Sequence, residues 1–306
     1  MCKNFLDLFD HSTEELLMLI DKSRELKALY VSGQTDRCLE SKSMVMLFEK
    51  PSMRTRISFE VGMTDLGGFA INVRPDDIGG LIGEREPISD MTRVLNGYCD
   101  VIVARTFGHN VITEIAKHAT IPVINALTDE CHPCQAMADM LTIVEHCGVL
   151  TGKKITYIGD GNNMSRSLAV ACAKLGLHFT VAAPSSYDMP ASFYEKVRAI
   201  SNTEITSTED VKDAVKDANI IYTDTWTSMG QEDEKAQRIK DFSGYCIDAT
   251  LLESAPSTAK VMHCLPAYRN LEITDEVIDS KSSVIFEQAH NRLHFQRALL
   301  KYLING

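Results

Sequence analysis

The sequence predicts an α/β protein of two domains, each a parallel sheet flanked by helices. The chain has 306 residues, of which 44% are hydrophobic and 24% are charged, so it can bury a large core and divide in two. Strand-like and helix-like patterns alternate along the chain, which is typical of parallel sheets with helices on their faces. Residues 148–154 interrupt this alternation, and we expect the domains to join near 145–153.

The first half contains an opening helix followed by strand and helix patterns in turn. Ser12 and Glu15 form a capping box ahead of 16–31, whose apolar spacing suits an amphipathic helix. Apolar runs predict strands at 43–48, 69–73, 99–105 and 121–126. Helical patterns follow these strands at 55–67, 87–98, 110–119 and 133–147. Ligands of such sheets bind beyond the carboxyl ends of the strands, so the turns after strands are the candidate sites.

The second half repeats the alternation. Apolar runs predict strands at 154–159, 178–183, 219–224, 259–264 and 282–287. A final helix is predicted at 288–304. The second half therefore forms its own α/β layer.

Charge and cysteine content limit the function. The formal net charge of -11 disfavours nucleic acid and anionic membranes as partners, so a phosphate-bearing ligand must be small and held by local arginines. The 9 cysteines are odd in number and scattered, which suits reduced thiols better than a disulfide framework. No apolar run approaches the roughly 18 residues of a membrane span, and the first residues lack the pattern of a signal peptide. We expect a cytoplasmic protein.

The first candidate site is the turn after the strand at 43–48. Ser52, Met53, Arg54 and Thr55 fall at the start of the next helix. Free N–H groups and the helix dipole favour an anion at such a position, and two hydroxyl groups with a guanidinium suit a phosphate. The simpler interpretation is that Ser52 or Thr55 only caps the helix and that the arginine is solvated.

The second candidate site is the turn at 131–134. Cys131 and Cys134 at a helix start, with a histidine between them, have the spacing of a thiol-disulfide oxidoreductase. This redox function is the alternative from a different class of protein. A zinc site that adds His146 and Cys147 is less favoured, because adjacent helical residues point apart.

The third candidate site is the turn after the strand at 154–159. Gly159 and Gly161 begin a dinucleotide-binding pattern, but Met164 occupies the position of its third glycine, so a nicotinamide cofactor is not expected. Asn162 and Asn163 remain at the helix start. They either form Asx turns or bind a carboxylate and an amine.

Two further turns complete the set. One follows the strand at 219–224 and presents Asp224, Ser228 and Met229. The other follows the strand at 259–264 and presents Cys264 and Leu265. A single cysteine in such a place is more often a small core residue than a reactive thiol.

Together these turns resemble the ornithine carbamoyltransferase family over nearly the whole chain. The family motif Ser-Thr-Arg-Thr-Arg corresponds to 52–56, and its His-Pro-x-Gln motif corresponds to 132–135. Its Asp-x-x-x-Ser-Met-Gly, His-Cys-Leu-Pro and Asn-Arg-Leu-His motifs correspond to 224–230, 263–266 and 291–294. The motifs occur in family order.

The resemblance implies transfer of the carbamoyl group of carbamoyl phosphate to the side-chain amine of L-ornithine, which gives L-citrulline and phosphate. This chemistry needs fixed hydrogen-bond donors and close placement of the reactants, but no metal or organic cofactor. The implied domains are a carbamoyl-phosphate-binding domain at 1–145, joined by the C-terminal helix at 287–306, and an ornithine-binding domain at 146–286. The family also implies a homotrimer.

The resemblance assigns roles to single residues. The implied catalytic residues are Arg105, His132, Cys264 and Arg292. The residues implied to bind carbamoyl phosphate are Ser52, Met53, Arg54, Thr55, Arg105, His132, Gln135, Leu265 and Arg292. The residues implied to bind ornithine are Leu127, Asn163, Asp224, Ser228, Met229 and Cys264. Cys264 is given a positioning role beside the reacting amine.

Some residues depart from the family pattern. Met53 replaces a threonine, and Gly79 stands where a neighbouring subunit usually reaches the phosphate with a longer side chain. Arg166 and Tyr268 replace a common asparagine and a histidine. These changes leave a carbamoyltransferase for putrescine or an acylated ornithine as an alternative. Asp224 favours ornithine, because its carboxylate has a purpose only when the donor carries a free α-amine.

Overall fold

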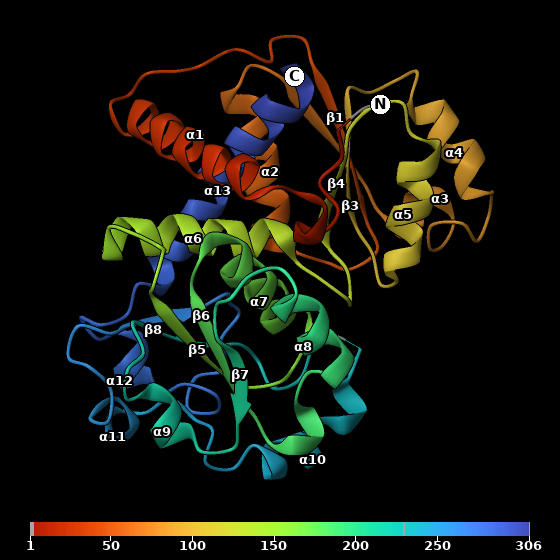
Figure 1. The fold of residues 1–306 in the computed structure, drawn as a ribbon. Helices are drawn as coiled ribbons and strands as arrows, with labels where there is room; N and C mark the ends of the chain where they lie inside the picture. The colour runs from red at the N-terminus through yellow and green to blue at the C-terminus, as the bar shows by residue number, and fades with distance from the viewer. Residues whose placement is uncertain (1–2, 229, 306) are drawn as a thin grey trace. The chain divides into compact units, whose positions relative to one another are not determined.

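The computed structural model describes residues 3–228 and 230–305, and these form two compact units. The first unit contains residues up to Leu141 and those from His290 onward, and the second contains Thr142–Ala289. Helices α6 (Pro133–Cys147) and α13 (Ile285–Asn305) each contribute residues to both units. The first unit is therefore assembled from segments near both ends of the chain (Figure 1).

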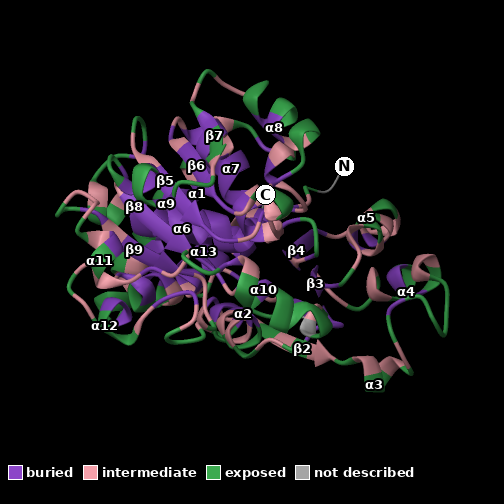
Figure 2. Ribbon diagram, turned by 90° about the horizontal axis from the view of Figure 1, so that it is seen from below, coloured by how far each residue is buried: buried purple, intermediate pink, exposed green. Residues whose placement is uncertain are grey.

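The first unit is built on a parallel sheet of four strands in the order β2-β1-β3-β4. The strands are β1 (Ser43–Phe48), β2 (Phe69–Val73), β3 (Val101–Arg105) and β4 (Val123–Leu127). Every residue of β1 and β3 is buried, whereas β2 forms an edge of the sheet and is partly exposed (Figure 2). The continuous apolar runs of β1 and β3 thus reflect strands covered on both faces.

Helices cover both faces of this sheet. They are α1 (Thr13–Val31), α2 (Met53–Asp65), α3 (Pro75–Ile78), α4 (Ile88–Leu95) and α5 (His109–His118), together with parts of α6 and α13. Figure 1 shows α4 and α5 on one face and α1 and α2 on the other. Alternate strand residues such as Val45 and Ile102 pack against Met91 of α4 and Ile112 of α5, as the two-residue period of a strand requires.

The second unit is built on a parallel sheet of five strands in the order β7-β6-β5-β8-β9. The strands are β5 (Lys154–Ile158), β6 (His178–Ala182), β7 (Ile205–Thr208), β8 (Ile220–Thr223) and β9 (Lys260–His263). The helices are α7 (Asn163–Leu175), α8 (Ala191–Arg198), α9 (Val211–Val215), α10 (Lys235–Asp241), α11 (Ala249–Leu252) and α12 (Asp275–Ile278). Short 3-10 turns are η1 (Leu8–Asp10) in the first unit, and η2 (Ser185–Tyr187) and η3 (Glu232–Glu234) in the second.

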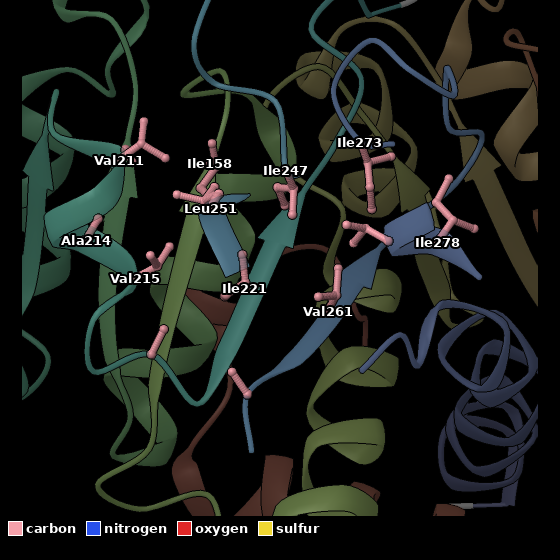
Figure 3. Close-up of a cluster of buried hydrophobic side chains, with 14 of the residues drawn as sticks. Ile158, Val211, Ala214, Val215, Ile221, Ile247, Leu251, Val261, Ile273 and Ile278 are labelled. Atoms are coloured by element: carbon pink, nitrogen blue, oxygen red, sulfur yellow. The ribbon is translucent and has the colours of Figure 1, made fainter. Parts of the chain in front are cut away.

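One face of the second sheet is covered by a continuous aliphatic cluster. Ile158, Ile221 and Val261 project from three neighbouring strands, and Val215 and Leu251 pack against them from α9 and α11 (Figure 3). These strand residues are fully buried or nearly so. The packing holds the carboxyl ends of β5, β8 and β9 side by side, where the candidate turns begin.

The predicted fold class, two parallel sheets flanked by helices, is confirmed. The predicted strand at 282–287 is wrong. Val261 and Ser283 pair only through an isolated bridge, and α13 begins at Ile285, because the helical pattern continues upstream of the expected start. The fifth strand is β7, which the sequence analysis missed. Among the described residues, no helix combines the length and the apolar character needed to cross a bilayer.

Candidate active site

The turn after β1 begins a helix, and its capping is visible. Ser52 is the N-cap of α2, and its hydroxyl oxygen accepts a hydrogen bond from the backbone N–H of Thr55 at 3.4 Å. Arg54 is half-buried, and Met53 is 66% exposed. The remaining N–H groups of the first helical turn have no acceptor within the helix, so they can bind an anion. Ser52 thus caps the helix and leaves the other N–H groups of its first turn available to an anion.

Arg292 connects two residues of the expected carbamoyl phosphate site. It lies in the part of α13 that belongs to the first unit and is almost fully buried. Its Nη2 donates to the Thr55 hydroxyl at 2.8 Å, and its Nη1 donates to Gln135 Oε1 at 2.6 Å. Because the Thr55 oxygen accepts from Arg292, its own hydrogen can be donated to an anion.

His132 lies close to two guanidinium groups. Arg105 is the last residue of β3, and His132 directly precedes α6. Burial first, and then the positive charges of Arg292 and Arg105, hold the pKa of His132 well below its ordinary value of 6.5. The imidazole is therefore neutral at physiological pH, when it can donate one N–H to a carbonyl oxygen.

Glu49 is a site residue that the sequence analysis missed. Its side chain is buried, and its two carboxylate oxygens accept the backbone N–H groups of Ile82 and Phe107, each at 3.0 Å. Its own N–H donates to the Arg105 carbonyl at 2.9 Å. Glu49 therefore fixes the turn after β1 to the turn after β3. An acidic residue directly after the apolar run of a buried strand was the available signal.

Gly79 has a structural reason to be glycine. It ends α3 with a φ of 76°, the left-handed conformation that side chains disfavour. An added Cβ would lie 3.1 Å from the Arg85 side chain. The departure from the family pattern at this position thus coincides with a tight helix end.

The turn between β5 and α7 in the second unit is organised by Asn162. Its Oδ1 accepts the backbone N–H groups of Met164 at 2.9 Å and Ser165 at 3.2 Å, which caps α7. Its Nδ2 donates to Asp224 Oδ2 at 3.3 Å. Asn163, the expected ligand, is the half-buried first residue of α7. Asn162 is therefore an Asx cap that also orients Asp224.

Asp224 lies beside Cys264 and His263. One ligating atom from each of the three side chains lies within 4.8 Å of the others, and Thr225 N–H donates to Asp224 Oδ1 at 2.8 Å. His263 contacts protein groups through both ring nitrogens, since Nδ1 accepts from Leu265 N–H at 2.8 Å and Nε2 contacts Glu272 at 3.1 Å. This histidine has no nitrogen left for a metal. The cluster suits a bound ammonium group better than a metal ion.

The other expected ligands fall within the same units. Ser228 is half-buried, and its N–H donates to Gln231 Oε1 at 3.1 Å. Leu265 has a φ of 58°, so the chain has left the extended conformation of β9 at this residue. Leu127 ends β4 in the first unit, and Met229 lies outside the described residues. The structure thus places the expected carbamoyl phosphate residues in the first unit, except Leu265, and the described ornithine residues in the second unit, except Leu127.

Cys131 and Cys134 are poorly suited to redox chemistry. Both are free and buried. Burial raises the pKa of the Cys134 thiol to about 12, and it raises the pKa of Cys131 further. Thiol-disulfide exchange requires a thiolate, so these shifts are opposite to those of a redox motif.

A zinc site at the end of α6 is not supported. His146 is exposed, and neither it nor Cys147 belongs to the potential metal-binding groups found among residues 3–228 and 230–305. The group in the first unit is Asp7, His109 and Cys131. In this group the Cys131 thiol already donates a hydrogen bond to the Leu6 carbonyl, with 3.6 Å between sulfur and oxygen.

Two family models cover almost the entire chain. The carbamoyl-P binding domain of aspartate/ornithine carbamoyltransferases matches residues 3–145, and the Asp/Orn binding domain matches residues 151–303. The chain belongs to the aspartate/ornithine carbamoyltransferase family. The family prediction is thus confirmed.

Relatives and solved structures within this family are similar over the full length. The ornithine carbamoyltransferase of Haloquadratum walsbyi is 47% identical over 99% of this chain and 98% of its own. That of Bacillus subtilis is 45% identical over 99% of this chain and 94% of its own. The structure of ornithine carbamoyltransferase from Pyrococcus furiosus matches with a TM-score of 0.95 and 42% identity, covering 99% of this chain and 97% of that one.

Proposed function

We propose that the chain transfers the carbamoyl group of carbamoyl phosphate to the side-chain amine of L-ornithine, giving L-citrulline and phosphate. The observation that carries this proposal is the Asp224 carboxylate, held by Asn162 and Thr225 beside the Cys264 thiol. A buried carboxylate at the end of a strand is suited to the α-ammonium group of an amino acid. Ornithine carbamoyltransferases at 45–47% identity over the whole chain support the same reaction.

Carbamoyl phosphate is bound in the first unit. The N–H groups at the start of α2 take the phosphate, with Ser52, the Met53 backbone, Arg54 and the Thr55 hydroxyl. Arg105 spans the phosphate and the carbonyl oxygen. Arg54 and Arg105 thus place positive charge where the leaving phosphate accumulates negative charge.

The carbonyl oxygen is polarised by His132 and Arg292. Attack by the amine builds negative charge on this oxygen, and a neutral imidazole N–H and a guanidinium stabilise it. Gln135 Oε1 and the Leu265 carbonyl accept from the carbamoyl NH2 group and orient it. The hydrogen bond from Arg292 to Gln135 at 2.6 Å holds that amide in place.

Ornithine is bound in the second unit. Asp224 takes the α-ammonium, Asn163, Ser228 and the Met229 backbone take the remaining polar groups, and Cys264 lies beside the reacting amine. Leu127 lines the methylene chain. Only the neutral amine attacks, so the rate rises with pH toward an amine pKa of about 10.

We also propose a homotrimer or a multiple of it. Met53 and Ile57 on α2, and Phe69 and Ile71 on the edge strand β2, are each about half-exposed or more. This apolar surface suits coverage by a second copy of the chain. A location in the cytoplasm accords with free thiols at every described cysteine.

The proposed domains are 1–145 with 287–306, which binds carbamoyl phosphate, and 146–286, which binds ornithine. The compact units, divided at Leu141 and His290, support these boundaries to within a few residues. Arg292 then belongs to the phosphate-binding domain despite its position late in the chain.

The decisive experiment measures carbamoyl transfer by the purified protein without added metal. Ornithine, putrescine, acetylornithine and aspartate are offered in parallel with carbamoyl phosphate. We expect strong preference for ornithine, and Asp224→Asn should raise the KM for ornithine while leaving that for carbamoyl phosphate unchanged. Preference for another amine would overturn the ornithine assignment, and no transfer to any of the four would overturn the reaction.

A further inference from the structure

We infer that Arg238 is a positioning residue of the ornithine site, which it serves by holding together the two turns that carry Asn162 and Asp224. The inference rests on the proposed function of Asp224 as the partner of the α-ammonium group. Arg238 has no expected contact with either substrate. Its role is to fix the Asp224 carboxylate and to neutralise a second carboxylate close to it.

The contacts of Arg238 define this role. The residue lies on α10 and is buried, with only 6% of its surface exposed. Its Nη1 donates to Asp160 Oδ2 at 2.6 Å and to the Trp226 carbonyl at 3.0 Å. Its Nε donates to Glu234 Oε2 at 2.8 Å. One guanidinium nitrogen therefore binds both turns at once.

These two contact points flank the expected ligands. Asp160 lies in the turn between β5 and α7, two residues before Asn162, and Trp226 lies two residues after Asp224. The Trp226 ring also stacks on Phe242 at the end of α10, with ring centroids 5.5 Å apart. Residues of α10 and its C-terminal end thus hold the turn after β8 at two points, the Trp226 carbonyl and the Trp226 ring.

The first turn is restrained from its other side as well. Gly161 packs so closely that an added Cβ would lie 2.6 Å from the Met189 backbone nitrogen. The guanidinium of Arg238 lies over the Tyr187 ring, 4.9 Å from its centroid. The Asn162 N–H donates to the Asp160 carbonyl at 2.8 Å, so a shift of Asp160 on loss of Arg238 would also move Asn162, which orients Asp224.

Charge balance gives Arg238 its second function. Asp160 is buried, which raises its pKa, and the negative charge of Asp224 adds to this effect. Arg238 opposes it through its hydrogen bond and its charge, and Arg166 opposes it more weakly. The charge of Arg238 balances the charge of Asp160. Of the two carboxylates, Asp224 is therefore the one left to bind an ammonium group.

The test compares Arg238→Met with Arg238→Lys and with the matched control Arg198→Met. Arg198 is exposed, but it also donates to a backbone carbonyl in the second unit, that of Ile205, and lies over the Tyr194 ring; neither partner belongs to the two turns. The readouts are the KM values for both substrates, kcat, and inhibition by L-norvaline, which carries the α-amino and carboxylate groups of ornithine without its side-chain amine.

For Arg238→Met we expect the ornithine KM and the norvaline inhibition constant to rise together by at least tenfold. The carbamoyl phosphate KM should stay within twofold and kcat within threefold. Arg238→Lys should recover part of the loss, and adding Asp160→Asn to Arg238→Met should recover part as well, because it removes the unpaired carboxylate. Arg198→Met should leave all four constants unchanged.

Unchanged ornithine and norvaline constants in Arg238→Met would overturn the inference. A fall in kcat while the ornithine KM and the norvaline inhibition constant stay unchanged would also overturn it. So would equal rises in the KM values for ornithine and carbamoyl phosphate. If Arg238→Met does not fold, Arg238→Lys and the double variant carry the same comparison. Failure of the wild-type protein to carbamoylate ornithine would reject the proposed function itself, which distinguishes the two results.

Discussion

His263 Nδ1 accepts a hydrogen bond from the backbone N–H of Leu265 at 2.8 Å. Since this nitrogen is an acceptor, the neutral ring carries its hydrogen on Nε2 and donates it to Glu272 at 3.1 Å. Glu272 Oε1 also accepts the Tyr268 N–H at 2.6 Å. The turn that presents Cys264 and the Leu265 carbonyl is thus held from inside by a buried His–Glu pair.

Replacing Glu272 with alanine should destabilise this turn. The change leaves the His263 Nε2–H and the Tyr268 N–H without their buried acceptor, so we expect the free energy of unfolding to fall by about 1–3 kcal/mol per unsatisfied group. Urea unfolding measures this loss. Glu272→Gln keeps one acceptor oxygen and should lose much less; equal losses in both variants would show that the hydrogen bonds are not the cause.

Replacing Arg54 with alanine should slow carbamoyl transfer. Deletion of one preorganised donor costs about 3–4 kcal/mol of transition-state stabilisation, so kcat/KM should fall by about two to three orders of magnitude. Arg56→Ala is the matched control, since Arg56 is exposed and pairs with Glu60 at 2.9 Å. Near-normal transfer by Arg54→Ala would reject the placement of the phosphate at α2.

Replacing His132 with asparagine should change the pH dependence of stability. The folded chain keeps the pKa of His132 well below 6.5, whereas the unfolded chain titrates near 6.5. As the pH falls below 6.5, the unfolded chain binds a proton that the folded chain does not, so this residue removes up to about 1.4 kcal/mol of stability per pH unit. In urea unfolding, His132→Asn should therefore gain stability relative to wild type between pH 8 and pH 5. A constant difference across that range would contradict the pKa shift.

Replacing Cys131 and Cys134 together with serine should leave carbamoyl transfer within a few-fold of wild type. Neither thiol is ionised near neutral pH, because burial raises the pKa of both. The steady-state rate of citrulline formation measures the effect. Loss of transfer in a variant that still folds would return the redox interpretation to consideration.

The fold was predictable where strands are buried on both faces. Continuous apolar runs such as β1 and β3 indicate strands without any tertiary information. The edge strand β7 was missed because Ile205–Thr208 is short, polar and largely exposed. The apolar residues around Val284 indicated a strand, but one bridge to β9 does not prevent the following helix from beginning at Ile285.

The candidate site was predictable where ligands follow strands directly. Asp224, Arg105 and Cys264 immediately follow or end strands, so parallel topology brings such residues to the carboxyl edge of each sheet. Glu49 and Arg238 act through contacts with residues far along the chain. Local sequence patterns contain no information about such partners.

The late position of Arg292 has a consequence for synthesis. Its partner Thr55 lies 237 positions earlier, so the residues of β1–β4 and α2 are synthesised before this guanidinium. A nascent chain at that stage lacks one of the groups proposed to hold carbamoyl phosphate. The ligand should therefore stabilise a chain in which α13 has formed more than one that still lacks it, which couples ligand binding to the docking of this helix on the first unit.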